Sequence, residues 1–278
     1  MMRGMFAAIS GLKNHQIMLD VTANDIANVN TIGYKSARTT FKDALSQNQR
    51  GAAGATATNA GANATQIGLG VGLGSVDNLM TGGALQTTGN PLDVAIQGDG
   101  FFQLAQGAPT NNGDPLTPKY FSRAGNFTIN SAGFLTSQEG YYVAGRTIGG
   151  TTTGAIKIDP KATDVTIDQN GVVSYLDPAT KTRVSAGSIE LATFSNPAGL
   201  EREGGNRWMA TVNSGTPTTD TPNSGAAGPV VSGAVEMSNV DLATTFTNMI
   251  TAQRGFQANS RVISTADEML QDLVNMKH

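Results

Sequence analysis

The feature that most constrains this chain is an apolar spacing of alternately four and three residues at both of its ends. The spacing runs from Met5 to Ile26 near the start and from Leu242 to Val274 near the end, with a few polar interruptions. It averages about 3.5 residues, which indicates long helices that pack along a coiled-coil-like seam. A helix with such a stripe needs a partner that covers it. We therefore expect the two terminal helices to pair with each other and with neighbouring copies of the chain.

The apolar members of this predicted assembly seam fall on one face of each helix. They are Met5, Ile9, Leu12, Leu19 and Ile26 in the first helix, and Leu242, Phe246, Met249, Phe256, Ile263, Leu270 and Val274 in the last. A second stripe of the last helix comprises Val262, Ala266, Met269, Leu273 and Met276. Two stripes on one helix imply more than one packing partner. The alternative is a helix that is buried on several sides within a single fold.

Local signals predict where the helices begin and end. The first helix is expected over residues 3–28, where Asn and Gly residues stop it, and a second short helix is expected over 35–47. Gly4 and Gly11 lie inside the first helix, either because another backbone approaches closely or because glycine is tolerated there at a cost on the order of 1 kcal/mol each. The last helix is expected to start at Ser238, with Asp241 completing a capping box.

The middle of the chain has a different period. Over residues 76–211 the apolar period is two, which predicts short antiparallel strands. The turn Asp168–Gly171 contains an Asn-Gly pair that favours a hairpin, and Trp208 and the pair Phe101–Phe102 are expected to fill the core. The segment Gly68–Gly74 alternates glycine with apolar residues, which predicts a strand with one bare face against which another segment packs closely.

These patterns predict an α+β chain. Long N- and C-terminal helices form a coiled-coil-like assembly domain, and a central all-β domain of short antiparallel strands lies between them in the sequence. The expected division is an N-terminal helical assembly domain over 1–47, a Gly/Ala-rich linker over 48–75, a central β domain over 76–212, a flexible linker over 213–232, and a C-terminal helical assembly domain over 233–278 that pairs with the N-terminal one.

Composition narrows the classes of function. Charged residues make up 14% of the 278 residues and the net charge is -3, which argues against a nucleic-acid partner. So little charge is typical of a surface covered by partners or of a secreted, loop-rich protein. The sequence has no cysteine, which rules out disulfides and thiolate metal sites. No apolar run approaches about eighteen residues and the N-terminal segment is interrupted by polar residues, so we expect neither membrane insertion nor a cleaved signal peptide.

The chain offers no convincing catalytic or cofactor site. The two histidines, His15 and His278, have no metal-ligating companion at helical spacing. Asp93, Asp99 and Asp114 are the carboxylates that a glycosidase would pair, but Asp residues near Gly usually form turns. We therefore expect that the protein is not an enzyme and binds no cofactor or metal.

Ala23–Lys35 near the start of the chain reads Ala-Asn-Asp-Ile-Ala-Asn-Val-Asn-Thr-Ile-Gly-Tyr-Lys, and Ser238–Leu242 and Met249–Ser260 lie near its end. These segments resemble the signature sequences of the bacterial flagellar axial proteins, the family of rod and hook proteins. Asp25 stands where this family usually has Asn, a nearly isosteric change that can lose an amide hydrogen bond. The blocks Thr88–Phe102 and Phe121–Phe127 resemble further shared blocks, in the same order along the chain. The family-motif residues of the two ends are Asn24, Ile26, Ala27, Asn28, Asn30, Thr31, Gly33 and Tyr34, followed near the C-terminus by Gln253 and Arg254.

The resemblance implies a structural subunit of the bacterial flagellum, in its hook and basal body. Such subunits pass through the flagellar export apparatus without a cleaved signal peptide and add beneath a hook or rod cap. They polymerise with copies of themselves into a hollow helical tube, and they contact neighbouring axial proteins of the rod, the hook and the hook–filament junction. The resemblance also implies that the terminal helices form the inner layer of this tube and the β domain an outer layer.

Two members of the family fit the sequence. The segments Thr251–Phe256 and Asp267–Gln271 resemble the flagellar hook protein, a universal joint that transmits motor torque. The chain length leaves room for one β domain, which resembles the distal rod protein, a rigid drive shaft. We expect a hook subunit, with the distal rod subunit as the alternative. A secreted carbohydrate-active enzyme or an adhesin are alternatives of a different class.

Overall fold

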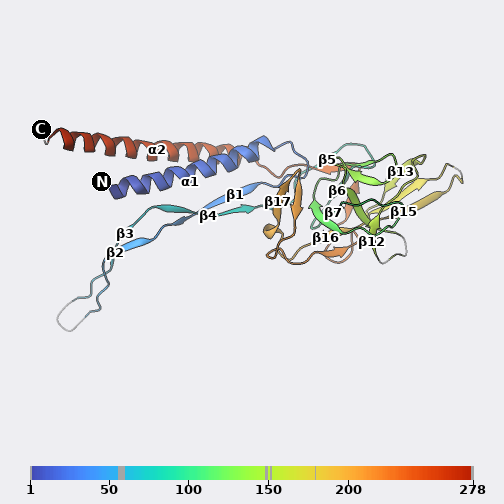
Figure 1. Cartoon of the computed structure of the whole chain (residues 1–278), viewed down its shortest axis with the longest axis horizontal. Coiled ribbons are helices and arrows are strands. Elements are labelled where there is room, and N and C mark those ends of the chain that lie inside the picture. Colours follow the sequence, from blue (N-terminus) through green and yellow to red (C-terminus); the bar gives the residue numbers. More distant parts are fainter. Residues whose placement is uncertain (1, 56–59, 148–149, 151, 179, 277–278) are drawn as a thin grey trace. The chain divides into compact units, whose positions relative to one another are not determined.

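The computed structural model describes residues 2–55, 60–147, 150, 152–178 and 180–276, and the chain divides into two compact units (Figure 1). Unit 1 joins residues 1–27, 37–78 and 241–278. Unit 2 joins residues 28–36 and 79–240. Both ends of the chain therefore fold into the same unit.

Unit 1 contains two long helices and a ribbon of paired strands. Helix α1 (Met2–Ala27) and helix α2 (Leu242–Asn275) pack against each other. The ribbon has two antiparallel strand pairs: β1 (Ala37–Asp43) with β4 (Val71–Asn78), and β2 (Ser46–Arg50) with β3 (Thr65–Gly68). A two-stranded ribbon is marginally stable in water, so its contacts with α1 stabilise it.

The ribbon differs from the sequence predictions. The short helix expected over 35–47 is wrong, because β1 and β2 occupy this segment. Thr39, Thr40 and Phe41 favour extended backbone, and pairing with β4 overrides the weak helical pattern. Much of the expected linker over 48–75 is also extended and paired, in β2, β3 and β4. Part of that low-complexity segment, residues 56–59, lies outside the described residues.

Helix α2 begins later than expected. Asp241 is itself the N-cap residue, and its carboxylate accepts hydrogen bonds from the Ala243 amide (3.0 Å) and the Thr244 hydroxyl (2.6 Å). These two bonds lower the pKa of Asp241 below its ordinary value of 3.8. The expected capping box at Ser238 is wrong, because this residue lies in the extended segment before the helix. The Asp residue thus caps the helix alone.

Unit 2 is built from short strands and one 3-10 turn, η1 (Pro197–Gly199). The strands are β5 (Leu85–Thr87), β6 (Val94–Ile96), β7 (Phe101–Ala105), β8 (Pro118–Ser122), β9 (Phe127–Ile129), β10 (Leu135–Ser137), β11 (Tyr142–Arg146), β12 (Thr153–Ala155), β13 (Thr163–Ile167), β14 (Val172–Leu176), β15 (Arg183–Ile189), β16 (Leu191–Thr193), β17 (Glu201–Gly204), β18 (Arg207–Met209), β19 (Thr218–Asp220), β20 (Val230–Ser232) and β21 (Ala234–Glu236).

Strand β7 lies at the centre of this unit. It pairs with β8, β11 and β16 in the largest sheet, which has 13 strands among the described residues. All five of its residues are buried, because hydrophobic clusters cover both of its faces. Phe102 packs edge-to-face on Phe127, with the ring centroids 4.9 Å apart. Phe101 joins Trp208 in a second cluster, as the sequence predicts for these aromatic residues.

Two predicted features of unit 2 can be compared with the structure directly. The hairpin at Asp168–Gly171 is confirmed: the Gly171 amide donates to the Asp168 carbonyl (2.8 Å), and β13 pairs with β14. The segment 213–232, expected to be a flexible linker, contains β19 and β20, which pair with β16 and β6. In the part of the chain that the structure describes, no helix has the length and apolar character needed to cross a membrane.

Candidate assembly site

The buried face of helix α1 is not the face that carries the predicted assembly seam. Ile9 is exposed, and Met5, Leu12, Leu19 and Ile26 are half-buried. The fully buried positions are Ala8, Gly11, Asn14, Thr22 and Asp25. Ala8, Gly11 and Asp25 each precede a seam position by one residue, which is a rotation of about 100° around a helix. The face of α1 that is buried within this chain therefore consists of small and polar residues, and the predicted seam is turned partly outward.

Helix α2 shows a related shift. Its covered positions keep the four-three spacing and are Thr245, Met249, Ala252, Phe256, Asn259, Ile263, Ala266 and Leu270. Of these, Met249, Phe256, Ile263 and Leu270 belong to the predicted assembly seam. The polar residues that interrupt the predicted spacing on α2 are Gln253, Ser260 and Asp267. In the structure, the covered residues are instead their preceding neighbours Ala252, Asn259 and Ala266. The remaining seam members Leu242, Phe246 and Val274 are exposed.

Two glycines set how closely the helices approach. A methyl group placed on Gly11 of α1 would lie 2.6 Å from Asn259 Nδ2 of α2, and one placed on Gly255 of α2 would lie 2.6 Å from the His15 ring of α1. The two contacts are reciprocal and four residues apart on each helix, and their order shows that the helices are antiparallel. The close neighbour of Gly11 is thus a side chain rather than another backbone, and Gly4 has open space around it. Gly11 and Gly255 each accommodate one polar side chain, so together the contacts define the register of the helix pair.

Helix α1 also holds the edge of the ribbon. The Ser10 hydroxyl accepts the Val71 amide (3.2 Å), and the Asn14 amide donates to the Val71 carbonyl (2.8 Å). Both backbone groups of this β4 residue are therefore satisfied by one helix. Gly70 lies against Ala7 and Ser10, so a segment does approach closely there, but the single strand expected over the glycine-alternating segment is interrupted between β3 and β4 at this residue. Asp25 receives the Ala37 amide on both carboxylate oxygens (3.2 Å each), an arrangement that suits a carboxylate at this position.

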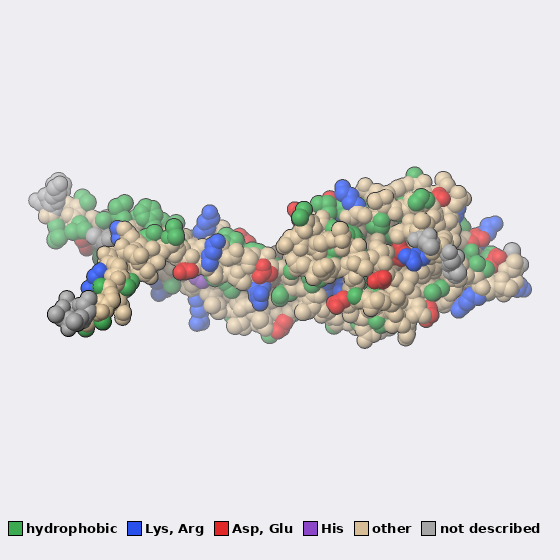
Figure 2. Space-filling model, turned by 90° about the horizontal axis from the view of Figure 1, so that it is seen from below, with side chains coloured by type: hydrophobic (Ala, Val, Ile, Leu, Met, Phe, Trp, Pro, Cys, Tyr) green, Lys and Arg blue, Asp and Glu red, His purple; other side chains and the backbone are tan. Residues whose placement is uncertain are grey.

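Many large apolar side chains of unit 1 are exposed. Figure 2 shows hydrophobic side chains gathered at the end of this unit where α2 finishes. They form three groups. The outer α1 stripe consists of Met2, Phe6 and Ile9; the outer α2 stripe consists of Val262, Met269, Leu273 and Met276; and the start of α2 exposes Leu242, Phe246 and Ile250. Apolar surface arranged in this way is typical of a protein–protein interface.

The family-motif residues after α1 fold into unit 2. Gly33 and Tyr34 are buried, and the Gly33 amide donates to the Glu236 carbonyl (2.8 Å). Gly33 has a φ of +68°, and a side chain there would collide with the backbone of Ala124. The Arg202 guanidinium lies over the Tyr34 ring, 4.9 Å from its centroid. The shape of this segment thus depends on a glycine and a cation–π contact.

Directly after this segment lies a buried ion cluster of Lys35, Arg123 and Glu236. Lys35 Nζ is 2.5 Å from Glu236 Oε1, and Arg123 Nη1 is 3.3 Å from Glu236 Oε2. All three side chains are at most 3% exposed. Burial lowers the pKa of Lys35 below its ordinary value of 10.5, and the Glu236 carboxylate partly opposes this shift. The cluster carries two cations against one anion, so the carboxylate is the group on which its stability depends.

The ion cluster joins segments that are distant in sequence. Lys35 Nζ donates to the Thr81 carbonyl (2.8 Å), and the Gly83 amide donates to Glu236 Oε1 (2.9 Å). Close by, the Asn239 side chain accepts the Ser36 amide (2.7 Å) and donates to the Thr81 carbonyl (3.2 Å). These bonds connect the three stretches of unit 2 that lead to and from unit 1. Sequence reasoning missed them, although Lys35 directly follows the family motif.

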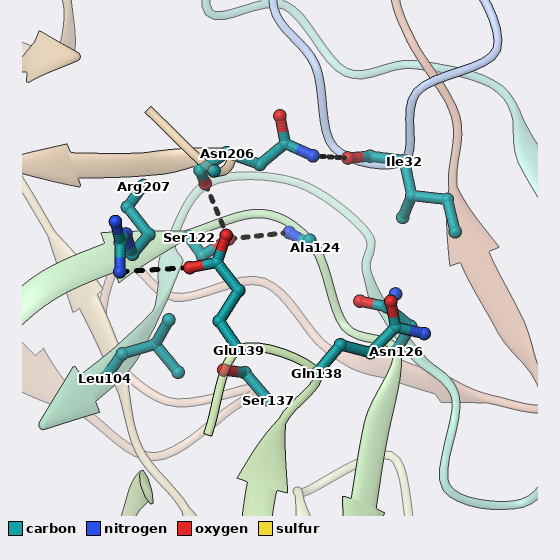
Figure 3. A pocket seen from close by; sticks show the side chains of 11 residues that line it. Ile32, Leu104, Ser122, Ala124, Asn126, Ser137, Gln138, Glu139, Asn206 and Arg207 are labelled. Atoms are coloured by element: carbon teal, nitrogen blue, oxygen red, sulfur yellow. Dashed lines mark hydrogen bonds and ion pairs between the residues drawn. The ribbon is translucent and has the colours of Figure 1, made fainter. Parts of the chain in front are cut away.

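A small cavity lies beside the motif segment (Figure 3). Its volume is about 130 Å³, and its lining includes Ile32, Ser122, Glu139, Asn206 and Arg207. Asn206 donates to the Ile32 carbonyl (2.9 Å), Ser122 donates to the Asn206 carbonyl (2.8 Å), and Arg207 pairs with Glu139 (3.0 Å). The volume suits a few water molecules rather than an organic substrate. Its polar groups hold the motif segment on the sheet.

The carboxylates weighed as catalytic residues have structural contacts. Asp93 accepts from the Thr88 hydroxyl (2.6 Å) and the Asn90 amide (3.2 Å). Asp114 accepts the amide of Asn111, the amide of Thr110 and the hydroxyl of Thr110, and these bonds lower its pKa below the ordinary 3.8. Asp99 lines a cavity of about 270 Å³. Within the described ranges, no group of three or more His, Cys, Asp or Glu side chains could hold a metal ion; His278 lies outside them.

The remaining motif residues lie at the surface or partly covered. Asn24, Ala27 and Asn30 are exposed, and Ile26, Asn28 and Thr31 are half-buried. Thr31 donates from its hydroxyl to the Asn28 side chain (3.0 Å). On α2, Gln253 and Arg254 directly follow the buried Ala252, and both are exposed. The structure therefore does not bring the N- and C-terminal motif residues into one cluster.

Three protein families match this chain. Residues 5–35 match the family described as "Flagella basal body rod protein", residues 95–175 match "Flagellar hook protein FlgE/F/G D1 domain", and residues 231–276 match "Flagellar basal body rod FlgEFG protein C-terminal". The matches cover α1 with the motif segment, the centre of unit 2, and α2.

Whole proteins are similar as well. The flagellar basal-body rod protein FlgG of Bacillus subtilis is 45% identical over the full length of both chains. That of Caulobacter vibrioides is 36% identical over 97% of both chains. The flagellar hook protein FlgE of Borreliella burgdorferi is 28% identical in an alignment that spans both chains completely.

Proposed function

This chain belongs to the family of flagellar basal-body rod and hook proteins, and we propose that within this family it is a subunit of the distal rod. The family is a structural one whose members are parts of the flagellum, and membership implies polymerisation with itself and with neighbouring flagellar proteins. The rod subunit would transmit motor torque as a rigid shaft.

The observation that carries the proposal is the similarity to rod proteins over the whole chain. Identity to the Bacillus subtilis rod protein is 45% over the full length of both chains. Identity to the Borreliella burgdorferi hook protein is 28%, in a longer alignment. The hook was the first expectation, because two short C-terminal segments resemble it. Similarity over the whole length outweighs those segments, so the rod is favoured.

The architecture of unit 1 supports assembly through the terminal helices. The helix pair buries mainly small and polar residues and exposes its large apolar ones. Burial of apolar surface is worth roughly 25 cal/mol per Å², so neighbouring copies would stabilise these helices in a polymer. We propose that the helices of many copies form a coiled-coil-like inner layer, in which the predicted assembly seam meets other subunits.

Further partners follow from the same proposal. The subunit would pass the flagellar export apparatus without a cleaved signal peptide and add beneath a rod cap. Its chain lacks cysteine, so no disulfide can link it before or after passage. The hook and the other rod proteins would adjoin its polymer at the two ends.

Site-specific labelling in intact flagella tests the proposal. Lys161 is exposed on unit 2, and Lys161→Cys introduces a single thiol into a cysteine-free chain. Maleimide-gold labelling of isolated hook-basal bodies should place particles along the rod below the hook in electron micrographs, and the unmodified chain serves as the control for background. Particles along the hook would contradict the rod and support the hook.

A further inference from the structure

We propose that a cavity of unit 2 binds a carboxylate group carried on an apolar stem, and that the buried Arg123 guanidinium anchors this carboxylate. The cavity has a volume of about 270 Å³, and β7, β16 and the turn η1 contribute to its lining. This ligand site goes beyond the proposed function and does not depend on it, because a rod subunit and a hook subunit could both carry it.

Arg123 has hydrogen-bond donors to spare. Its side chain is 3% exposed and lines the cavity. A guanidinium carries five N–H donors. Among the described residues, the one hydrogen bond of this group runs from Nη1 to Glu236 Oε2 (3.3 Å), and Nε has no partner. A buried donor without an acceptor costs free energy, so an acceptor supplied by a ligand would stabilise the site.

The charges around the cavity favour an anion at Arg123. The ion cluster behind it sets Lys35 and Arg123 against the single carboxylate of Glu236. Burial, and to a smaller degree the Arg123 charge, lowers the pKa of Lys35. The other charged residue of the lining is Asp99, which is exposed and forms no ion pair with Arg123 in the described part of the chain. The buried side of the cavity is therefore positive, and its solvent side carries the acid.

The walls of the cavity select the rest of the ligand. Met80, Phe101, Phe194 and Pro197 line it, and the Arg123 guanidinium lies over the Phe101 ring, 5.0 Å from its centroid. An apolar cavity of about 150 Å³ holds benzene, so the larger volume here has room for an aromatic ring with a carboxylate. A small inorganic anion would lose its hydration against these apolar walls without compensation. The ligand class that fits is an organic carboxylate.

Two sources share this chemistry. One is a free carboxylic acid, and the other is an acidic side chain of a neighbouring protein that enters together with an apolar residue. Both place a carboxylate at Arg123 and an apolar group between Phe101 and Phe194, so one probe molecule tests the site for either source.

Phenylacetate is the probe, titrated into the dilute full chain by isothermal calorimetry. We expect binding at one site, because its ring and carboxylate match the walls and the guanidinium. Phenylacetamide has the same shape without the charge, and phenethylamine carries the opposite charge, so both should bind at least tenfold more weakly. Phenylacetate that does not bind, or that binds no better than phenylacetamide, would overturn the inference.

Two substitutions show whether the probe occupies this cavity. Arg123→Met removes the anchor and leaves Lys35 and Glu236 as one cation against one anion, so unit 2 should still fold, as Trp208 fluorescence in urea checks. Ala226→Phe fills the cavity from an exposed lining position and leaves the ion cluster unchanged. Each variant should weaken phenylacetate binding at least tenfold. Unchanged affinity in either folded variant would overturn the site, and Ala226→Phe decides alone if Arg123→Met does not fold.

The acid on the solvent side gives a test of opposite sign. Asp99→Asn removes a like charge near the bound carboxylate, so it should tighten phenylacetate binding about threefold. Asp159→Asn is the matched control, because Asp159 is exposed and lies outside the lining, and its affinity should equal that of the unmodified chain. An Asp99→Asn affinity no higher than that of its control would contradict an anion in this cavity.

The two sources are separated by repeating the titration with the polymer. If a neighbouring protein inserts its acidic side chain, phenylacetate binding should fall at least tenfold on polymerisation. If the ligand is a free acid, the affinity should stay within about twofold of that of the monomer. Either result supports the carboxylate site. A chain that gold labelling locates in the rod but that binds no phenylacetate would overturn this inference and leave the proposed function intact.

Discussion

The two units of this protein bury opposite kinds of side chain. In unit 2, large aromatic and aliphatic residues such as Phe102, Phe127 and Ile189 are essentially inaccessible to solvent. In unit 1, the buried positions are small or polar, as at Ala8, Gly11 and Ala252, while the large apolar residues of its helices are exposed or half-buried. A unit of the first kind contains its own hydrophobic core. A unit of the second kind completes its core with other molecules, so the difference separates the self-sufficient part of the chain from the part that assembles.

The buried charges sharpen this contrast. Unit 2 buries the ion cluster of Lys35, Arg123 and Glu236, which stabilises only in a fixed, well-packed site. Unit 1 joins its elements through single polar side chains that bond to backbone groups, such as Asn14 with Val71 and the buried Asp25 carboxylate with the Ala37 amide. Such bonds can form and break at modest cost during assembly.

The largest effect is expected from removing the anion of the ion cluster. Glu236→Gln leaves Lys35 and Arg123 as two neighbouring buried cations, so it should lower the free energy of unfolding of unit 2 by about 3–5 kcal/mol. Urea denaturation followed by Trp208 fluorescence measures this. Lys35→Met is the control, because Arg123 still pairs with the carboxylate, and its effect should be smaller. Equal effects would show that the cluster does not depend on Glu236.

A matched pair of phenylalanines tests the contrast between the units directly. Phe102→Ala removes a fully buried ring of unit 2 and should cost about 3–5 kcal/mol of unfolding free energy. Phe246→Ala removes a ring that is 49% exposed on α2, and in dilute monomer it should change stability by less than about 0.5 kcal/mol. Light-scattering assays of polymerisation should give the opposite order, with a larger effect of Phe246→Ala than of Phe102→Ala. A large loss of monomer stability in Phe246→Ala would contradict the division.

Two glycines of α1 test the helix–helix contact. Both Gly4→Ala and Gly11→Ala raise helix propensity by about 1 kcal/mol. Gly4 has open space around it, so its variant should polymerise at least as well as the unmodified chain. At Gly11 the added methyl meets Asn259, and overpacking on the order of 1–3 kcal/mol should outweigh the gain. Critical concentrations give the comparison, and identical behaviour of the two variants would refute the register contact.

The smallest effect concerns acid. The folded pKa of Asp241 lies below 3.8, so its contribution is present above that pH and is lost as the pH falls through the folded pKa. In the polymer, protection factors of the first α2 amides should fall in this acidic range. Asp241→Asn keeps a capping oxygen but does not titrate, so its protection should not change there. A fall of equal size in both chains would assign the effect to other carboxylates.

Periodicity predicted the two long helices and the short strands of the middle, because both depend on local patterns of apolar residues. It predicted that the terminal helices pair with each other, but it did not predict which residues make the contact, since Ala8, Gly11 and Ala252 carry no strong hydrophobic signal. The helix expected over 35–47 became a strand because β4, distant in sequence, pairs with it. Long-range pairing of this kind leaves little trace in a single segment.

The ion cluster shows a second limit. Its three members stand far apart in the sequence, and each looks like an ordinary surface residue there. Lys35 follows the family motif directly, and this was the one available signal. The resemblance to rod and hook proteins identified the family, which periodicity could not do. Its preference for the hook over the rod rested on two short C-terminal segments.

Hydrogen exchange of the full chain, in dilute monomer and in polymer, tests most directly whether unit 1 completes its core through other copies. We expect strong protection of β7, β8 and β11 in both states, and protection of α1 and α2 amides that rises at least a hundredfold on polymerisation, as burial worth roughly 2.7 kcal/mol would give. Terminal helices that are already as protected in the dilute monomer as in the polymer would contradict it.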